Sequence, residues 1–315
     1  GTGDYADPVY YRRDRSPWYP YRLQITSAEV NMSGMTNSSY MFFDCNTLVS
    51  VDVRNFDTSE VTNMSSMFEG CCSLADIDVS HFSTTKVNDM SGMFYLGVDW
   101  DEAASVSYSC DSALEVLDVS NFDTTNVYSM DNMFMGCTSL TNLELGNFNT
   151  SKVTSMISMF ANCSGLTELD LSNFDTSKVT SMISMFENCS GLTELDLSNF
   201  DTTKVGNMSG MFKDCSGLTE LDLSNFDTSK VTYMNSMFFG CSGLTELDVT
   251  GFDTSNVMEM WAMFRDCSGL TELDVTGFDT SNVMYMAWMF EGCIGLTKLD
   301  VTGFDTSNAT DMRYM

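Results

Sequence analysis

Apolar residues recur along this chain in an order that repeats every 26 residues. The clearest copy, Leu166 to Gly191, reads LTELDLSNFDTSKVTSMISMFENCSG. A fixed period of this length is typical of repeat architectures, in which each repeat buries its apolar face by stacking on its neighbours. We therefore predict a stack of about ten coils. They begin at Leu48, Leu74, Leu114, Leu140, Leu166, Leu192, Leu218, Leu244, Leu270 and Leu296.

The first part of each copy has the alternation of a strand. Leu166, Leu169 and Leu171 fit the pattern L-x-x-L-x-L, and residues 168–172 alternate between inward and outward positions. Phe174 follows as a further core residue. This pattern predicts one short strand in every coil.

The second part of each copy has the spacing of a short helix. Val179, Met182, Met185 and Phe186 fall at i, i+3, i+6 and i+7, with Asp175 as a candidate N-cap. The predicted fold is therefore an α/β solenoid, a leucine-rich-repeat-like stack of coils that each combine a short strand and a short helix. Residues that tolerate the left-handed conformation end the segment: Gly70, Gly136, Asn162, Asn188, Asp214, Gly240, Asp266 and Gly292.

Two regions depart from the repeat. Residues 1–47 match only its last third and carry aromatic residues around Trp18, which predicts an N-terminal cap before a solenoid over 48–315. An insertion at residues 95–109 separates the second and third coils, and it places Trp100 in an acidic cluster. We predict a projecting loop with a contact role. The chain stops at Met315 in the middle of a repeat, as a piece of a longer protein does.

Charge and composition narrow the possible functions. The chain has 44 acidic and 14 basic residues, a net charge of −30, which opposes binding to nucleic acid or anionic lipid and favours basic protein surfaces. Its only histidine is His81, so histidine metal sites and triad chemistry are not expected. No apolar run reaches the length of a membrane span, and no catalytic motif stands out. We predict a protein that is not an enzyme and needs no cofactor.

Three positions of the repeat hold the same residue type in successive coils, and we interpret these columns as parts of the scaffold rather than binding sites. The paired methionines, such as Met182 and Met185, suit irregular core space better than metal ligation. The cysteine column suits buried free thiols better than a disulfide ladder, and Cys72 and Cys110, which lie outside it, are the first place to look for a disulfide. The threonine column, such as Thr176, stands where hydroxyl groups bond to the backbone rather than form an ice-binding array.

An acidic column lies in the middle of the predicted strands, where its side chains must point outward. Alternatives remain open: a solvated face bonded to neighbouring Ser and Thr, a docking face for a basic protein, or a calcium site. If a basic protein docks there, this face governs long-range association. Its candidate residues are Asp170, Glu194, Asp196, Glu220, Asp222 and Asp248.

Large apolar residues replace small or polar ones on the second half of the C-terminal coils. Adjacent coils bring them together beside the buried face, so we predict an exposed protein-binding patch. The alternative is packing against further coils or a C-terminal cap. The candidate residues are Tyr233, Met258, Trp261, Arg265, Met284, Tyr285 and Trp288.

The consensus F-D-T-S-x-V-T-x-M-x-x-M-F-x-x-C-x-x-L-x-x-L-D-[LV] covers roughly residues 35–315. It resembles the 26-residue repeat of the BspA-like leucine-rich-repeat surface proteins of bacteria, which also occurs in mycoplasma lipoproteins. The resemblance implies a leucine-rich-repeat fold, export to the cell surface, and adhesion to host or neighbouring cells. It implies no catalytic residues. We therefore expect an extracellular, adhesin-type protein-binding module; the alternative is a spacer or stalk, stabilised by cations, that carries another domain.

Overall fold

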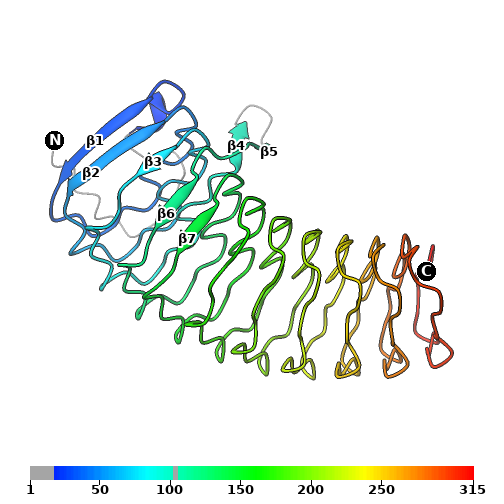
Figure 1. Cartoon of the computed structure of the whole chain (residues 1–315). Helices are drawn as coiled ribbons and strands as arrows, with labels where there is room; N and C mark the ends of the chain where they lie inside the picture. The colour runs from blue at the N-terminus through cyan, green and yellow to red at the C-terminus, as the bar shows by residue number, and fades with distance from the viewer. Residues whose placement is uncertain (1–17, 102–105) are drawn as a thin grey trace. The chain divides into compact units, whose positions relative to one another are not determined.

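The computed structural model describes residues 18–101 and 106–315, with side chains outside 98–109. The chain forms two compact units: Gly1–Val153 with Met159–Leu166, and Thr154–Ser158 with Thr167–Met315. Each unit is a stack of 26-residue coils, as the sequence period predicts (Figure 1). The predicted boundary at residue 47 stays a prediction.

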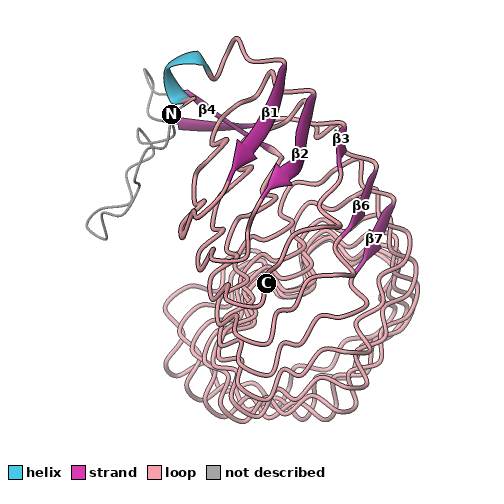
Figure 2. Cartoon of the chain, turned by 90° about the vertical axis from the view of Figure 1, so that its left-hand side faces the viewer, coloured by secondary structure: helices cyan, strands magenta, loops and turns pink. Residues whose placement is uncertain are grey.

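Short parallel strands line one side of the first unit (Figures 1 and 2). β1 (Ser27–Met32), β2 (Ser50–Phe56) and β3 (Asp76–Ile77) form one parallel sheet, and β6 (Val116–Asp118) pairs with β7 (Asn142–Glu144). Val51 pairs with Ile77, one repeat later, so each coil contributes one strand to the ladder. The insertion forms an antiparallel hairpin of β4 (Val98–Asp101) and β5 (Val106–Ser109).

The second unit keeps the alternation of the predicted strands without pairing them as strands in its described residues. Leu195 and Leu197 are buried, whereas Glu194 and Asp196 are exposed. The Ser198 N–H bonds to the Asp196 carboxylate at 2.9 Å instead of to the neighbouring coil. The same local bond occurs beside the paired strand β6, where the Ser120 N–H donates to the Asp118 carboxylate at 2.9 Å, so both units share this feature.

The predicted helix is wrong. The only helix in the described residues is a single 3-10 turn, η2 (Tyr19–Tyr21). In the segment after Val179, Ser184 and Asn188 have φ of 52° and 56°, values incompatible with a continuous helix. A run of tight turns therefore buries the methionines that we predicted a helix would bury.

Alternate amides in this segment bond to the next coil. The Glu187 N–H donates to the Ser184 carbonyl at 3.1 Å, within the turn, whereas the Phe186 N–H donates to the Met211 carbonyl at 2.9 Å. A helix needs every amide for its own i−4 carbonyl. Here every second amide joins the coils instead, and parallel bridges such as Asn207 with Tyr233 follow the same line.

The predicted core columns are confirmed. Met182, Met185 and Phe186 are fully buried, and the phenylalanine rings stack from coil to coil, as between Phe186 and Phe212 at 5.8 Å. In the first unit the Trp18 ring stacks on Phe42 at 6.4 Å and continues the column. The dispersion contacts of these rings and thioethers lie between neighbouring coils, so each coil is stabilised by the coil stacked on it.

The threonine column bridges coils through buried hydroxyl groups. Thr202 Oγ1 donates to the Asp227 carbonyl at 3.0 Å and accepts from the Asp227 N–H at 2.8 Å. Thr202 is about 1% exposed, so the buried hydroxyl has both its donor and its acceptor function satisfied by the next coil. The prediction of a structural role is confirmed.

The cysteines are also as predicted. The column thiols are free and buried or nearly so, and the Cys215 Sγ donates to the Phe186 carbonyl at 3.0 Å. Burial raises the pKa of Cys215 well above its ordinary value, so the group stays a neutral thiol. The disulfide joins Cys72 and Cys110, whose Cα atoms lie 6.2 Å apart, and it spans the insertion.

Candidate functional site

The acidic face consists of the outward residues of the strand-like segments, and the six predicted residues are all exposed. Its aspartates are partly committed to local structure. Asp248 Oδ1 accepts hydrogen bonds from the Thr250 N–H at 2.9 Å and from the Thr250 hydroxyl at 2.6 Å. These bonds lower the pKa of Asp248, with the hydroxyl bond as the larger cause. The expected bonds of this face to Ser and Thr are therefore present, whereas its role in docking a basic protein stays a prediction.

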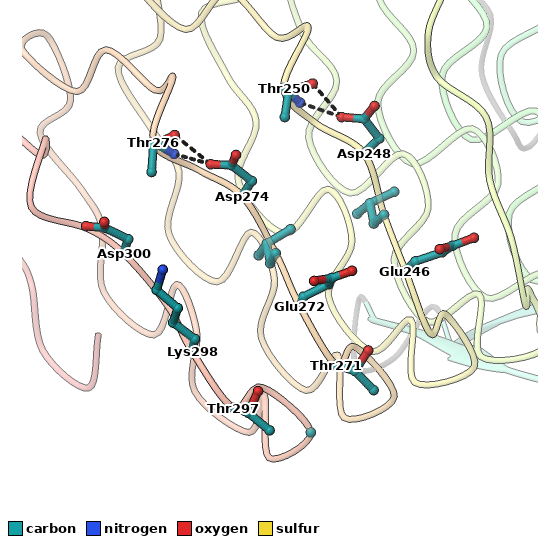
Figure 3. Close-up of a pocket in the computed structure, with 13 residues that line it drawn as sticks. Glu246, Asp248, Thr250, Thr271, Glu272, Asp274, Thr276, Thr297, Lys298 and Asp300 are labelled. Atoms are coloured by element: carbon teal, nitrogen blue, oxygen red, sulfur yellow. Dashed lines mark hydrogen bonds between the residues drawn. The ribbon is translucent and has the colours of Figure 1, made fainter.

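An open groove lies on this face in the last coils (Figure 3). Its volume, about 920 Å³, is comparable with that of ligand sites. Carboxylates from three coils line it, and one cation, Lys298, stands beside Asp300. In the described residues no three His, Cys, Asp or Glu side chains converge to hold a metal ion. Calcium binding stays an untested expectation.

The predicted C-terminal patch is exposed in part. Trp261 and Met284 are each 36% exposed and Tyr285 is 41% exposed, and Met258 and Tyr233 are half-buried beside them. We call these five residues the aromatic patch.

Backbone contacts between coils bring the patch together. Tyr233, Glu259 and Tyr285 occupy successive rungs of one ladder, and the Met284 N–H donates to the Met258 carbonyl at 2.9 Å. Trp261 Nε1 donates to Glu259 Oε2 at 3.3 Å, which holds the indole beside this ladder.

Trp288 stands apart from the exposed residues. It is half-buried and stacks on Tyr314 at 6.3 Å, with the Arg313 guanidinium 5.4 Å from its ring centre. Its φ is 59°, in a slot that holds Ser184 in an earlier coil. A bulky residue in the left-handed region costs roughly 1 kcal/mol or more, so stacking with the following coil must offset that cost. For Trp288 the alternative of packing against the next coil holds.

Arg265 belongs to a different column. Its Nε lies 2.9 Å from Glu291 Oε2 and its guanidinium lies 5.5 Å from the Phe239 ring centre. Lys213 Nζ lies 5.9 Å from the same ring centre and 2.6 Å from Glu187 Oε1. The structure thus ties Arg265 into a column in which two cations contact one phenyl ring and each cation pairs with a carboxylate, rather than leaving it free at the patch.

Sequence reasoning missed this column, although its members share one slot of the repeat. It also missed an asparagine column at the strand corner: Asn225 Nδ2 donates to the Leu197 carbonyl at 3.0 Å and to the Phe200 carbonyl at 2.9 Å. Glycines take that slot in the last three coils: Gly251, Gly277 and Gly303. Trp100, in β4, lies among the residues whose side chains are outside the described part, so its contact role stays a prediction.

The coils, their buried constant columns and their variable exposed positions define the class: a stacked-repeat protein. In the described residues, no helix is long and apolar enough to cross a membrane. The chain belongs to the family described as "Mycoplasma protein of unknown function, DUF285". The family model matches residues 22–112, 102–220, 154–249, 189–273 and 237–315.

Three of the similar solved structures are of bacterial proteins. A leucine-rich repeat protein of Eubacterium ventriosum is 17% identical, with 96% of this chain and 91% of that one covered and a TM-score of 0.31. A leucine-rich cell surface protein of Faecalibacterium prausnitzii is 16% identical, with 93% and 82% covered and a TM-score of 0.39. The functional domain of InlJ from Listeria monocytogenes is 19% identical, with 91% and 62% covered and a TM-score of 0.38. No curated protein matches the chain.

Proposed function

We propose that this chain is a non-catalytic, protein-binding module of a bacterial cell-surface protein of the BspA-like type. It acts as an adhesin: it recognises a protein of the host or of a neighbouring cell. The aromatic patch in the last coils is its main contact surface, and the acidic face steers the approach of a basic partner.

One observation carries the proposal. The constant columns are buried or bonded between coils, so they build the scaffold, whereas the variable exposed positions place Trp261, Met284 and Tyr285 in neighbouring coils. Exposed tryptophan, tyrosine and methionine side chains gathered in this way mark protein interfaces. A spacer needs only polar variation from coil to coil, and this clustering favours a binder.

The disulfide supports an extracellular location. Disulfides persist in oxidising compartments and are rare inside cells. Cys72 and Cys110 are paired although nine column cysteines remain free. The column thiols escape oxidation because burial protects them, so one disulfide among many free thiols is compatible with export.

The test compares a patch variant with a matched control. Trp261→Ala combined with Tyr285→Ala removes two exposed rings of the patch, and Tyr128→Ala removes a ring that is 50% exposed in the first unit. The full chain and both variants are used to capture proteins from host serum and mucosal extract, followed by quantitative mass spectrometry.

We expect the wild type and Tyr128→Ala to enrich the same proteins, and the double variant to lose them while melting at an unchanged temperature. Truncation of central aromatic residues at interfaces commonly costs about 2 kcal/mol or more of binding free energy. Equal enrichment by all three proteins contradicts the proposal that the patch is the contact surface.

A further inference from the structure

The surroundings of the aromatic patch are acidic. Residues 244–315 carry twelve carboxylates and three basic side chains. Two of the basic side chains are already neutralised, because Arg265 pairs with Glu291 at 2.9 Å and Arg313 pairs with Asp311 at 2.8 Å. The third, Lys298, lies in the acidic groove (Figure 3). Within residues 244–315 no other cation is left to pair with an acidic partner at the patch. Lys230, three residues before Tyr233, lies close to the Asp227 carboxylate.

Glu259 sets the charge at the centre of the patch. It lies on the rung between Tyr233 and Tyr285, and one of its carboxylate oxygens accepts the Trp261 Nε1–H. That bond is made with a neutral donor, so the carboxylate keeps its full charge within reach of the exposed rings. An incoming carboxylate would meet like charge beside apolar surface, and this repulsion selects against acidic partners.

We infer that the aromatic patch holds a cationic protein segment in which lysine or arginine stands next to aliphatic or aromatic residues. The inference rests on the proposed function and names its partner by chemistry. The apolar residues cover Met284 and the indole, and the cation lies over an exposed ring while it pairs with Glu259. The partner segment needs both kinds of residue. An apolar segment alone leaves the Glu259 carboxylate without a cation, and a polycation alone leaves the exposed rings in water.

Three synthetic peptides separate these contributions: five repeats each of Lys-Leu-Gly, Glu-Leu-Gly and Lys-Gly-Gly. Their binding to the full chain is measured by fluorescence anisotropy at several salt concentrations. We expect the Lys-Leu-Gly peptide to bind at least about tenfold more tightly than the Lys-Gly-Gly peptide, a difference of about 1.4 kcal/mol, and the Glu-Leu-Gly peptide not to bind.

Two variants locate the binding. Trp261→Ala lowers the affinity for the Lys-Leu-Gly peptide about tenfold, whereas Tyr128→Ala leaves it unchanged. Glu259→Gln preserves the acceptor for the indole but removes the charge, so it weakens binding and flattens the salt dependence.

Three outcomes overturn the inference: equal binding of the lysine-leucine and glutamate-leucine peptides, equal binding of the two lysine peptides, or an affinity that neither variant changes. None of these outcomes contradicts the proposed function. That proposal fails if the double variant Trp261→Ala with Tyr285→Ala captures the same host proteins as the wild type.

Discussion

At the scale of single residues, hydroxyl and amide side chains do as much as apolar ones to join the coils. Thr202 holds both backbone groups of Asp227, and Asn225 holds two carbonyls of the preceding coil. Such contacts are invisible in a hydropathy pattern, because a polar residue in a repeat looks like a surface residue.

Removal of one bridging hydroxyl should therefore destabilise the stack. In Thr202→Val the shape is kept, but the Asp227 N–H and carbonyl lose their shared partner in the preceding coil. We expect a loss of about 1–3 kcal/mol in the free energy of unfolding, measured by urea titration. Thr202→Ser retains the hydroxyl and serves as the control. If the valine variant is no less stable than the serine variant, the hydroxyl bridges contribute nothing.

The glycines of the last coils offer a gain of stability. Around Gly251 no atom lies within 4 Å of the place of a Cβ, and the Leu223 and Phe226 carbonyls lack the asparagine that Asn225 supplies to its own predecessor. We expect Gly251→Asn to stabilise the chain by about 1 kcal/mol, from new hydrogen bonds and a less flexible unfolded chain. Calorimetry is the measurement, and Gly251→Ala isolates the backbone contribution. A variant that melts at or below the wild-type temperature contradicts this reading of the column.

At the scale of the element, the unit of structure is a coil whose turn segment depends on the next coil for every second backbone hydrogen bond. The turns after Val179 cannot form alone, since every second amide bonds to the next coil. A second constraint is the close approach of backbones: a Cβ at Gly243 would lie 2.5 Å from the Ser216 carbonyl oxygen and 2.6 Å from that of Leu218.

This close approach predicts that the same change, glycine to alanine, has a different effect on stability at two positions. Gly243→Ala forces two backbones apart and should destabilise the stack by about 1–3 kcal/mol. Gly251→Ala meets open space and should not lower the melting temperature. The two variants are compared by thermal denaturation. Equal melting temperatures would show that the backbones at Gly243 can move apart without loss of stability.

The sequence predicts the buried columns and the outward acidic residues, because each depends on which side of the coil a residue faces. For the disulfide it indicates only where to look, since Cys72 and Cys110 lie outside the cysteine column. It fails on the helix. A spacing of three and four residues buries the same Met182, Met185 and Phe186 whether the chain turns as a helix or as successive tight turns. The choice depends on where the amides bond, and that is settled by the neighbouring coil. Arg265 is misassigned for a similar reason, since its partner Glu291 lies one repeat away.

At the scale of the whole molecule, many carboxylates accept hydrogen bonds from the second residue after them. The N–H bond from Ser224 is the main cause that lowers the pKa of Asp222, although Asp196 and Asp248 raise it. The local bond thus outweighs the repulsion between neighbouring coils. Beside Arg54 the pKa of Asp52 falls to about 2.

A lowered pKa in the folded state gives stability that is present above the ordinary pKa, about 4, and is lost as the pH falls through the folded value. We expect the melting temperature to hold down to about pH 5 and to fall between about pH 4 and pH 2. Asp222→Asn with Asp248→Asn keeps the acceptor but removes the titration, so the fall should be smaller. A melting temperature that rises in acid would mean that relief of the net charge dominates.

The bonds between coils run along the direction of stacking, and this has a mechanical consequence. A pull on the two ends of the chain loads the bonds of the outermost coil first, so coils should detach one after another. Each released repeat of 26 residues adds about 90 Å of contour length, at about 3.5 Å per residue. The disulfide joins Cys72 and Cys110 at a sequence separation of 38 and withholds the segment between them, so its reduction adds about 130 Å to the total extension. Under load the chain should therefore lengthen in steps, and single-molecule force spectroscopy would record a saw-tooth whose spacing is even over the coils that follow the insertion.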